Sequence, residues 1–122
     1  MSEPIRDFRD LLVWQKAMAF AKEVYRLTRT WPKEEQFGLT FHVRKAAVSV
    51  PSNIAEGHAR QGREFAHFLS IARGSLAEAE CQLLLAVELG YLTTGDLSTA
   101  MDLAQQIRRM SAVLAKKLAP DP

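Results

Sequence analysis

Helical periodicity runs through nearly the whole chain and constrains its fold more than any other feature. Apolar residues return every three or four positions, which is the spacing that places them on one face of an α-helix. Alternating runs joined by Asn-Gly turns, which indicate strands and hairpins, are nearly absent. The sequence therefore predicts an all-α protein, and its 122 residues fit a single domain with a core of its own.

Four helices are expected, and their boundaries follow from residues that favour helix ends. Trp31 precedes Pro32 and is therefore pushed out of the helical region, which ends the first helix. Thr93, followed three positions later by Asp96, matches a capping box before the last helix. Short loops between long helices favour antiparallel neighbours. We expect an up-and-down four-helix bundle with helices at about 7–29, 33–57, 63–89 and 94–118.

The second predicted helix contains a proline. Pro51 lies inside an apolar line that runs from Leu39 to Ile54. Proline removes one backbone hydrogen bond and crowds the carbonyl one turn earlier, so we expect a kink at Pro51 rather than a break. The helix is expected to end at Gly57, which together with Gly62 brackets a short loop.

The third predicted helix carries two lines of apolar or small residues, although a monomeric bundle needs only one. The expected core stripe consists of Phe65, Leu69, Ala72, Leu76, Ala79, Leu83 and Ala86. The second line contains only small residues: Ala66, Ser70, Gly74, Ala77 and Cys81. Small side chains let another helix approach closely. The second line therefore predicts packing against another copy of the chain, and a wide monomeric core is the alternative.

Few residues suggest catalysis or metal binding. His42, His58 and His67 have no standard ligand spacing, and phosphate-binding glycine loops and nucleophile motifs are missing. Cys81 is the one cysteine, so an internal disulfide is impossible, and its small neighbours favour packing over reactivity. We expect a protein that is not an enzyme and that uses no cofactor and no metal.

The same sequence indicates a cytoplasmic protein. The N-terminal segment is charged, unlike a signal peptide, and no apolar stretch is long enough to span a bilayer. A single cysteine is typical of a reducing compartment. We therefore expect no contact with a membrane.

Charge is distributed unevenly between the two ends of the predicted bundle, although the formal net charge is only +2. Basic residues gather at the end that holds the N-terminus, the second loop and the C-terminus, and acidic residues dominate the other end. A basic end attracts phosphates without reading bases, and assembly would set several such ends side by side. Ordinary solvated charge is the alternative. The candidate phosphate-contacting residues are Arg60, Arg63, Arg108, Arg109, Lys116 and Lys117.

A run of eleven residues in the second predicted helix, Ala-Val-Ser-Val-Pro-Ser-Asn-Ile-Ala-Glu-Gly, is highly specific and includes Pro51, Asn53, Glu56 and Gly57. Together with residues 44–46 just before it and the stretches at residues 10–17, 37–39, 64–65, 68–69, 74–76, 78 and 88–91, it resembles the four-helix-bundle proteins encoded in intervening sequences of bacterial 23S rRNA genes. The resemblance covers nearly the whole chain in order. It leaves out the chain ends and the segment from His58 to Arg63.

The resemblance implies a bundle that assembles as a ring, with five copies as the expected number, and it supplies no settled role. A related branch, the accessory proteins of diversity-generating retroelements, forms a pentameric barrel that works with nucleic acid, which extends to this chain only by analogy. Two functions remain open. One is a non-catalytic ring that binds RNA or DNA through its basic end, and the other is a structural or adaptor oligomer that binds a protein partner. Clustered arginines on one assembled face favour the first, and dispersed arginines favour the second.

Overall fold

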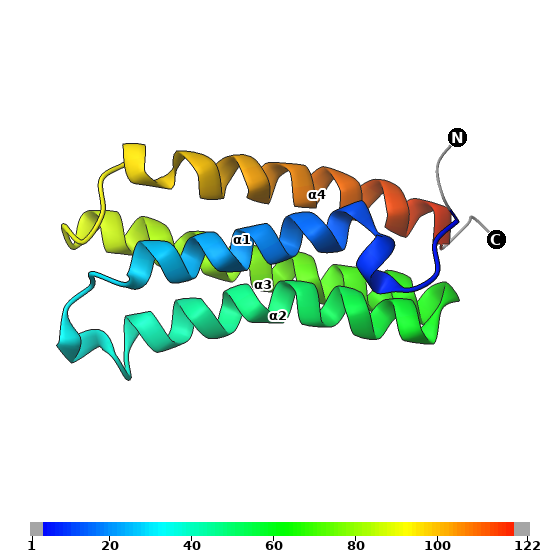
Figure 1. Cartoon of the computed structure of the whole chain (residues 1–122), viewed down its shortest axis with the longest axis horizontal. Helices are drawn as coiled ribbons and strands as arrows, with labels where there is room; N and C mark the ends of the chain where they lie inside the picture. Colours follow the sequence, from blue (N-terminus) through cyan, green and yellow to red (C-terminus); the bar gives the residue numbers. More distant parts are fainter. Residues whose placement is uncertain (1–3, 119–122) are drawn as a thin grey trace.

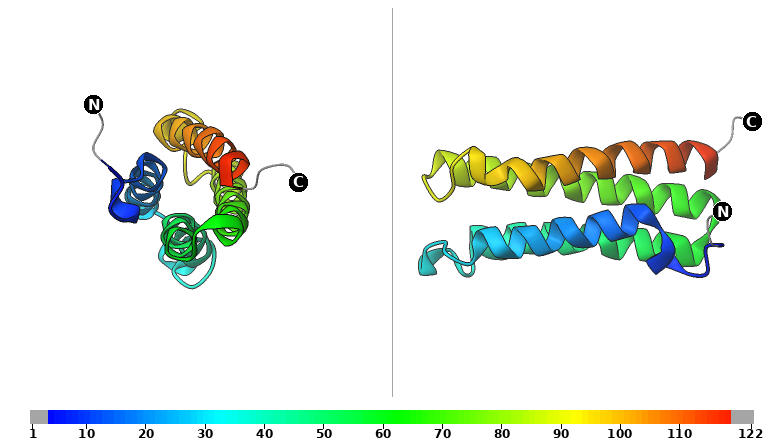
Figure 2. Two further views of the ribbon diagram at one scale, coloured as in Figure 1. Left: turned by 90° about the vertical axis from the view of Figure 1, so that its right-hand side faces the viewer. Right: turned by 45° about the horizontal axis from the view of Figure 1, so that its top comes forward.

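Four helices lie side by side along one axis in the structure, a computed structural model that describes residues 4–118 (Figure 1). The elements in chain order are the 3-10 helix η1 (Phe8–Asp10), α1 (Leu12–Thr28), η2 (Lys33–Glu35), α2 (Leu39–Arg60), α3 (Gly62–Glu88), η3 (Gly95–Leu97) and α4 (Ser98–Leu118). Seen from the end, the four α-helices surround a common centre in chain order, and each contacts the helices before and after it (Figure 2). The predicted all-α, up-and-down four-helix bundle is confirmed.

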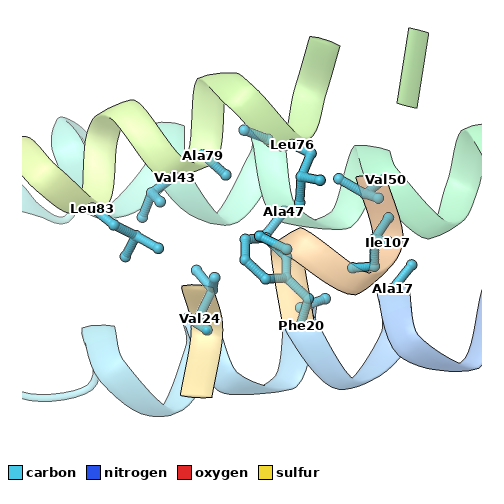
Figure 3. Close-up of a cluster of buried hydrophobic side chains, with 14 of the residues drawn as sticks. Ala17, Phe20, Val24, Val43, Ala47, Val50, Leu76, Ala79, Leu83 and Ile107 are labelled. Atoms are coloured by element: carbon cyan, nitrogen blue, oxygen red, sulfur yellow. The ribbon is translucent and has the colours of Figure 1, made fainter. Parts of the chain in front are cut away.

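The core fills the space between the four helices. Phe20 of α1, Val50 of α2, Leu76 of α3 and Ile107 of α4 meet there and are fully buried (Figure 3). Burying a side chain of this size stabilises the fold by about 1.5–3 kcal/mol. All seven residues of the core stripe predicted in the third helix are buried, so that prediction is confirmed as well.

The junction between α2 and α3 differs from the expected loop. α2 continues past Gly57 as far as Arg60, and α3 begins at Gly62, so Gln61 alone separates the two helices. Gln61 has φ 65° and ψ 169°, a conformation that residues other than glycine rarely adopt, and Gly62 after it has φ 58°, so these two residues reverse the chain.

Gly57 lies inside α2 because α3 packs directly against it. A Cβ atom at this position would lie 2.7 Å from Cβ of Phe68 and 2.9 Å from Cδ1 of Phe65. The interpretation of Gly57 as the start of a loop was therefore wrong. This glycine allows the close approach of two helices, and it does not end one.

The first two long helices begin later than expected because each follows a short 3-10 turn, and a carboxylate accepts a backbone hydrogen bond near each start. Asp7 accepts a hydrogen bond from the backbone N–H of Arg9 at 2.7 Å, so the chain forms η1 before α1 starts at Leu12. Oε1 of Glu35 accepts from the backbone N–H of Leu39 at 3.0 Å, which places the start of α2 there instead of near residue 33.

The capping box predicted before the last helix is present. Oδ2 of Asp96 accepts from the N–H of Thr93 at 2.8 Å, and the N–H of Asp96 donates to Oγ1 of Thr93 at 3.1 Å. Thr94 makes no capping hydrogen bond through its side chain. The box initiates η3, and α4 follows it directly at Ser98.

α2 runs on without interruption through Pro51, which is buried. The prediction that this proline does not end the helix is confirmed, and the bend expected there stays a prediction. The α2–α3 junction, the C-terminal end of α4 and η1 all lie at one end of the bundle, on the right in Figure 1. Within residues 4–118, no helix combines the length and apolar character that crossing a membrane requires.

Candidate functional site

An apolar groove of about 490 Å³ runs along the outside of the bundle between α1 and α2. A second hollow of about 430 Å³ continues it toward the start of α2 and shares Tyr25 and Val48 with it. We call the two together the α1–α2 groove. Its apolar lining comes from Trp14, Met18, Tyr25, Phe41, Val48, Pro51 and Ala55.

The groove forms because two apolar stripes lie next to each other and no third helix among residues 4–118 covers them. Met18 and Tyr25 are seven positions apart on α1, and Val48 and Ala55 are seven apart on α2, so each pair lies on one helix face two turns apart. Phe8 of η1 packs edge-on against Trp14, with the ring centroids 5.1 Å apart, and lines one end. Met18, Tyr25 and Val48 are each about two-fifths exposed. These side chains are therefore available for contact.

Basic side chains border this groove. Lys22 and Arg29 of α1 and Lys45 of α2 are exposed and lie along it. Arg44 is held within the chain, since its Nε donates to Oγ1 of Thr28 at 2.8 Å and its guanidinium lies 4.5 Å from the centre of the Tyr25 ring. The groove thus has an apolar floor and a positively charged rim.

The small-residue line predicted on the third helix lies on the outside of the bundle. Ser70, Gly74, Ala77 and Cys81 are exposed, and Ala66 is half-buried. A Cβ atom added to Gly74 would have no atom within 4 Å. This line is therefore not part of the intramolecular core, and the alternative of a wide monomeric core does not account for it.

Larger apolar residues continue the same surface of α3. Ile71, Leu84 and Leu85 are exposed and follow the small residues at helical spacing. Two exposed carboxylates, Glu78 and Glu88, lie on this surface as well. We call it the α3 outer face, defined by Ile71, Gly74, Ala77, Glu78, Cys81, Leu84, Leu85 and Glu88.

Two of the six predicted phosphate-contacting residues are engaged within the chain. Arg60 pairs with Glu56 at 3.1 Å and with Glu64 at 3.6 Å, and its guanidinium lies 5.2 Å from the ring centre of Phe68. Arg108 pairs with Glu80 of α3. Such exposed pairs contribute little to stability, but they offset charge that would otherwise attract phosphate.

The other four candidates remain open to solvent. Arg63, Arg109, Lys116 and Lys117 are exposed, and none of them forms an ion pair with another residue in the part of the chain that the structure describes. Arg63 opens α3 and the two lysines close α4, and these helix ends lie at the same end of the bundle (Figure 1). Arg109 and Lys117 also flank a small apolar hollow beside Val113.

The histidines and the cysteine form no reactive cluster. His58 and His67 lie edge-on to Phe65 and Phe68, respectively, and His42 lies edge-on to Phe41. Cys81 is free and exposed. Between residues 4 and 118, no group of three or more His, Cys, Asp or Glu side chains is placed to hold a metal ion.

The specific run in α2 positions this helix against its neighbours. Oγ of Ser49 lies 2.8 Å from Oγ of Ser75 on α3, and Nδ2 of Asn53 donates to the carbonyl and the hydroxyl oxygen of Ser49, both at 2.8 Å. Pro51 lines the groove on the α1 side, and Gly57 admits the phenylalanines of α3. The motif therefore sets the distance and register between helices and, through them, the shape of the groove.

Sequence reasoning found the α3 outer face but missed the groove. Met18 and Tyr25 recur at a spacing that fits a core stripe as well as an open one, so periodicity does not distinguish the two positions.

No curated protein matches this chain in sequence. The model of one protein family, described as 23S rRNA-intervening sequence protein, matches residues 9–113. That range includes the specific run in α2, the α3 outer face and all of the residues that line the α1–α2 groove except Phe8. The chain therefore belongs to the family of 23S rRNA-intervening sequence proteins.

Proposed function

We propose that the protein is a non-catalytic cytoplasmic scaffold that assembles with copies of itself and holds a nucleic-acid backbone at its assembled basic ends. The observation that carries the proposal is the pair of apolar surfaces that one copy leaves uncovered, the α1–α2 groove and the α3 outer face. Contiguous exposed apolar surface bordered by charge is typical of protein interaction sites. Five copies remain the expected number, because that number is what the sequence resemblance implies.

Replacing Gly74 by leucine tests the assembly. The bulky side chain would project from the α3 outer face, where an added Cβ meets no atom of residues 4–118 within 4 Å. Folding of one copy should therefore be spared, while close approach of another is blocked. Light scattering coupled to size-exclusion chromatography is expected to show an oligomer for the wild type and a smaller species for Gly74→Leu. Val113→Leu, at an exposed position of α4 outside both surfaces, is the matched control. A wild-type monomer at micromolar concentration would refute the proposal.

The four unpaired basic residues support the nucleic-acid part of the proposal. Phosphate contact needs cations free to release their counterions, and Arg63, Arg109, Lys116 and Lys117 meet that condition better than Arg60 and Arg108 do. No aromatic ring pairs with these four cations in the described part of the chain. The contact should therefore read charge and shape and not base sequence.

Binding of structured RNA as a function of salt tests this part. The double variant Arg63→Ala, Lys117→Ala should weaken binding to all sequences alike and flatten the log-log salt slope by about two units. Arg60→Ala is the control and should change the slope less, because its charge is already offset by Glu56 and Glu64. If the wild-type oligomer binds no nucleic acid at low salt, the nucleic-acid role is wrong and an adaptor for a protein partner takes its place.

A further inference from the structure

We propose that the α3 outer face of one copy docks into the α1–α2 groove of the next, so that the copies join head to tail. This inference rests on the self-association proposed above and adds which two surfaces meet. The shapes of the two surfaces support it. Gly74 and Ala77 bring the α3 backbone close to the molecular surface, which lets this helix sink between two others, and the groove is hollowed along α1 and α2.

The charges of the two surfaces are complementary. The groove rim is positive through Lys22, Arg29 and Lys45, and the α3 outer face is negative through Glu78 and Glu88. None of these five side chains forms an ion pair inside the described part of its own chain. Complementary potentials across an interface set orientation and disfavour wrong pairings.

The same charges argue against symmetric pairing. Two α3 outer faces pressed together would bring carboxylates of Glu78 and Glu88 near their equivalents, and two grooves pressed together would oppose lysines and arginines. Like charges set against each other are unfavourable. A contact between unlike surfaces avoids this repulsion.

The placement of the two surfaces gives the contact a direction. The groove lies on α1 and α2, whereas α3 lies across the bundle from α1 (Figure 2). Each copy therefore has one receiving surface and one inserted surface, and both remain available when the other is occupied. A contact of this kind repeats from copy to copy and closes into a ring when the rotation allows.

Cross-linking through Cys81 tests the pairing directly, because this thiol is free and lies on the α3 outer face. Val48→Cys places a second thiol in the groove. With a short bis-maleimide linker, this variant is expected to give a ladder of covalent dimers, trimers and higher species on a denaturing gel, since every copy then carries one reactive group on each surface. Adding Cys81→Ser should abolish the ladder. Val113→Cys, also at an exposed valine but outside both surfaces, should give none.

Each outcome has a distinct meaning. A ladder from Val48→Cys that Val113→Cys lacks supports head-to-tail docking. Oligomers by light scattering with no such ladder, from either Val48→Cys or Met18→Cys, overturn the docking and leave self-association standing. Efficient cross-linking of the wild type into dimers alone indicates symmetric α3 contacts and also overturns it. A monomer by light scattering overturns both proposals.

A charge exchange gives an independent readout. Lys22→Glu with Lys45→Glu should raise the dissociation constant of the assembly by about tenfold or more, because carboxylates would then face carboxylates. Adding Glu78→Lys and Glu88→Lys to the same chain should restore assembly, since the two surfaces are then complementary with exchanged signs. Failure of this restoration in a folded protein would contradict the proposed pairing.

Discussion

At the residue scale, Glu35 joins the two loops at the acidic end of the bundle. One carboxylate oxygen accepts from the backbone N–H of Leu39, and the other accepts from the hydroxyl of Tyr91 at 2.8 Å. The backbone hydrogen bond, followed by that from Tyr91, lowers the pKa of Glu35. The same contact raises the pKa of Tyr91. The cap of α2 and the hydrogen bond between the two loops thus both depend on the ionised Glu35 side chain.

Stability should respond to the charge of Glu35. Because its folded-state pKa lies below the usual value of 4.5, ionised Glu35 contributes stability that is present above that value and is lost as the pH falls through the folded pKa. Glu35→Gln should therefore be less stable than the wild type at pH 7, and the difference should shrink by pH 3. Urea unfolding at both pH values measures this, with Glu34→Gln on the same turn as the control. A difference that is unchanged at pH 3 would contradict the assignment.

Prediction from sequence succeeded for one cap between near neighbours, although the equally local caps by Asp7 and Glu35 were not predicted. Thr93 and Asp96 form their capping box three residues apart, and the spacing alone indicates it. Glu35 and Tyr91 are 56 positions apart, and no local rule pairs them. Their hydrogen bond exists because the bundle brings both loops to one end.

At the scale of elements, the α2–α3 pair is the most tightly specified part of the bundle. Gln61 and Gly62 reverse the chain. Gly57 has no side chain to separate the two helices, and the hydroxyls of Ser49 and Ser75 meet across the contact. The helices themselves follow from periodicity, which is a local property. The starts of α1 and α2 and the end of α2 do not follow from it, because they depend on caps by Asp7 and Glu35 and on packing at Gly57.

Gly57→Ala should destabilise the protein although alanine is the better helix former. Propensity alone would favour alanine by about 1 kcal/mol. The new Cβ, however, would lie within 3 Å of Phe65 and Phe68. Overpacking of this kind costs about 1–3 kcal/mol, so we expect a net loss of about 1 kcal/mol. Urea denaturation measures the free energy of unfolding.

Ala59→Gly, the opposite exchange at an exposed position in the last turn of the same helix, is the control and should lose up to about 1 kcal/mol through propensity. Helix propensity alone would make Gly57→Ala stabilising and Ala59→Gly destabilising. If both variants are less stable than the wild type, packing at residue 57 explains the loss in Gly57→Ala. A stabilised Gly57→Ala protein would show that α3 can move away without cost.

At the scale of the whole molecule, one copy of the bundle has a filled core but leaves apolar surfaces exposed. Its core is filled by residues from all four helices (Figure 3). Its exterior nevertheless keeps an apolar groove on α1 and α2 and an apolar face on α3. If these surfaces are covered only in the assembly, the stability of each copy depends on the presence of others.

Thermal unfolding should therefore shift with protein concentration. A tenfold rise in concentration is expected to stabilise each copy by up to about 1.4 kcal/mol, because only the folded chain assembles. The unfolding midpoint of the wild type should rise over a series from low to high micromolar concentration, whereas that of Gly74→Leu should stay nearly constant. Equal midpoints for the wild type across the series would argue against coupling between folding and assembly.

The sequence by itself determined the four antiparallel helices, the core stripe of α3, the capping box at Thr93 and the family. Each of these follows from residues close together in the chain: the spacing of apolar residues, the spacing of the capping residues and the family motif. The sequence also indicated that the small-residue line of α3 is not needed for the core of a monomeric bundle. Only the tertiary structure decided that Met18, Tyr25 and Val48 line an open groove, and that Arg108 is paired with Glu80 of another helix. The physical reason is that exposure and ion pairing depend on which helix lies alongside. That is set by the packing of residues far apart in the chain.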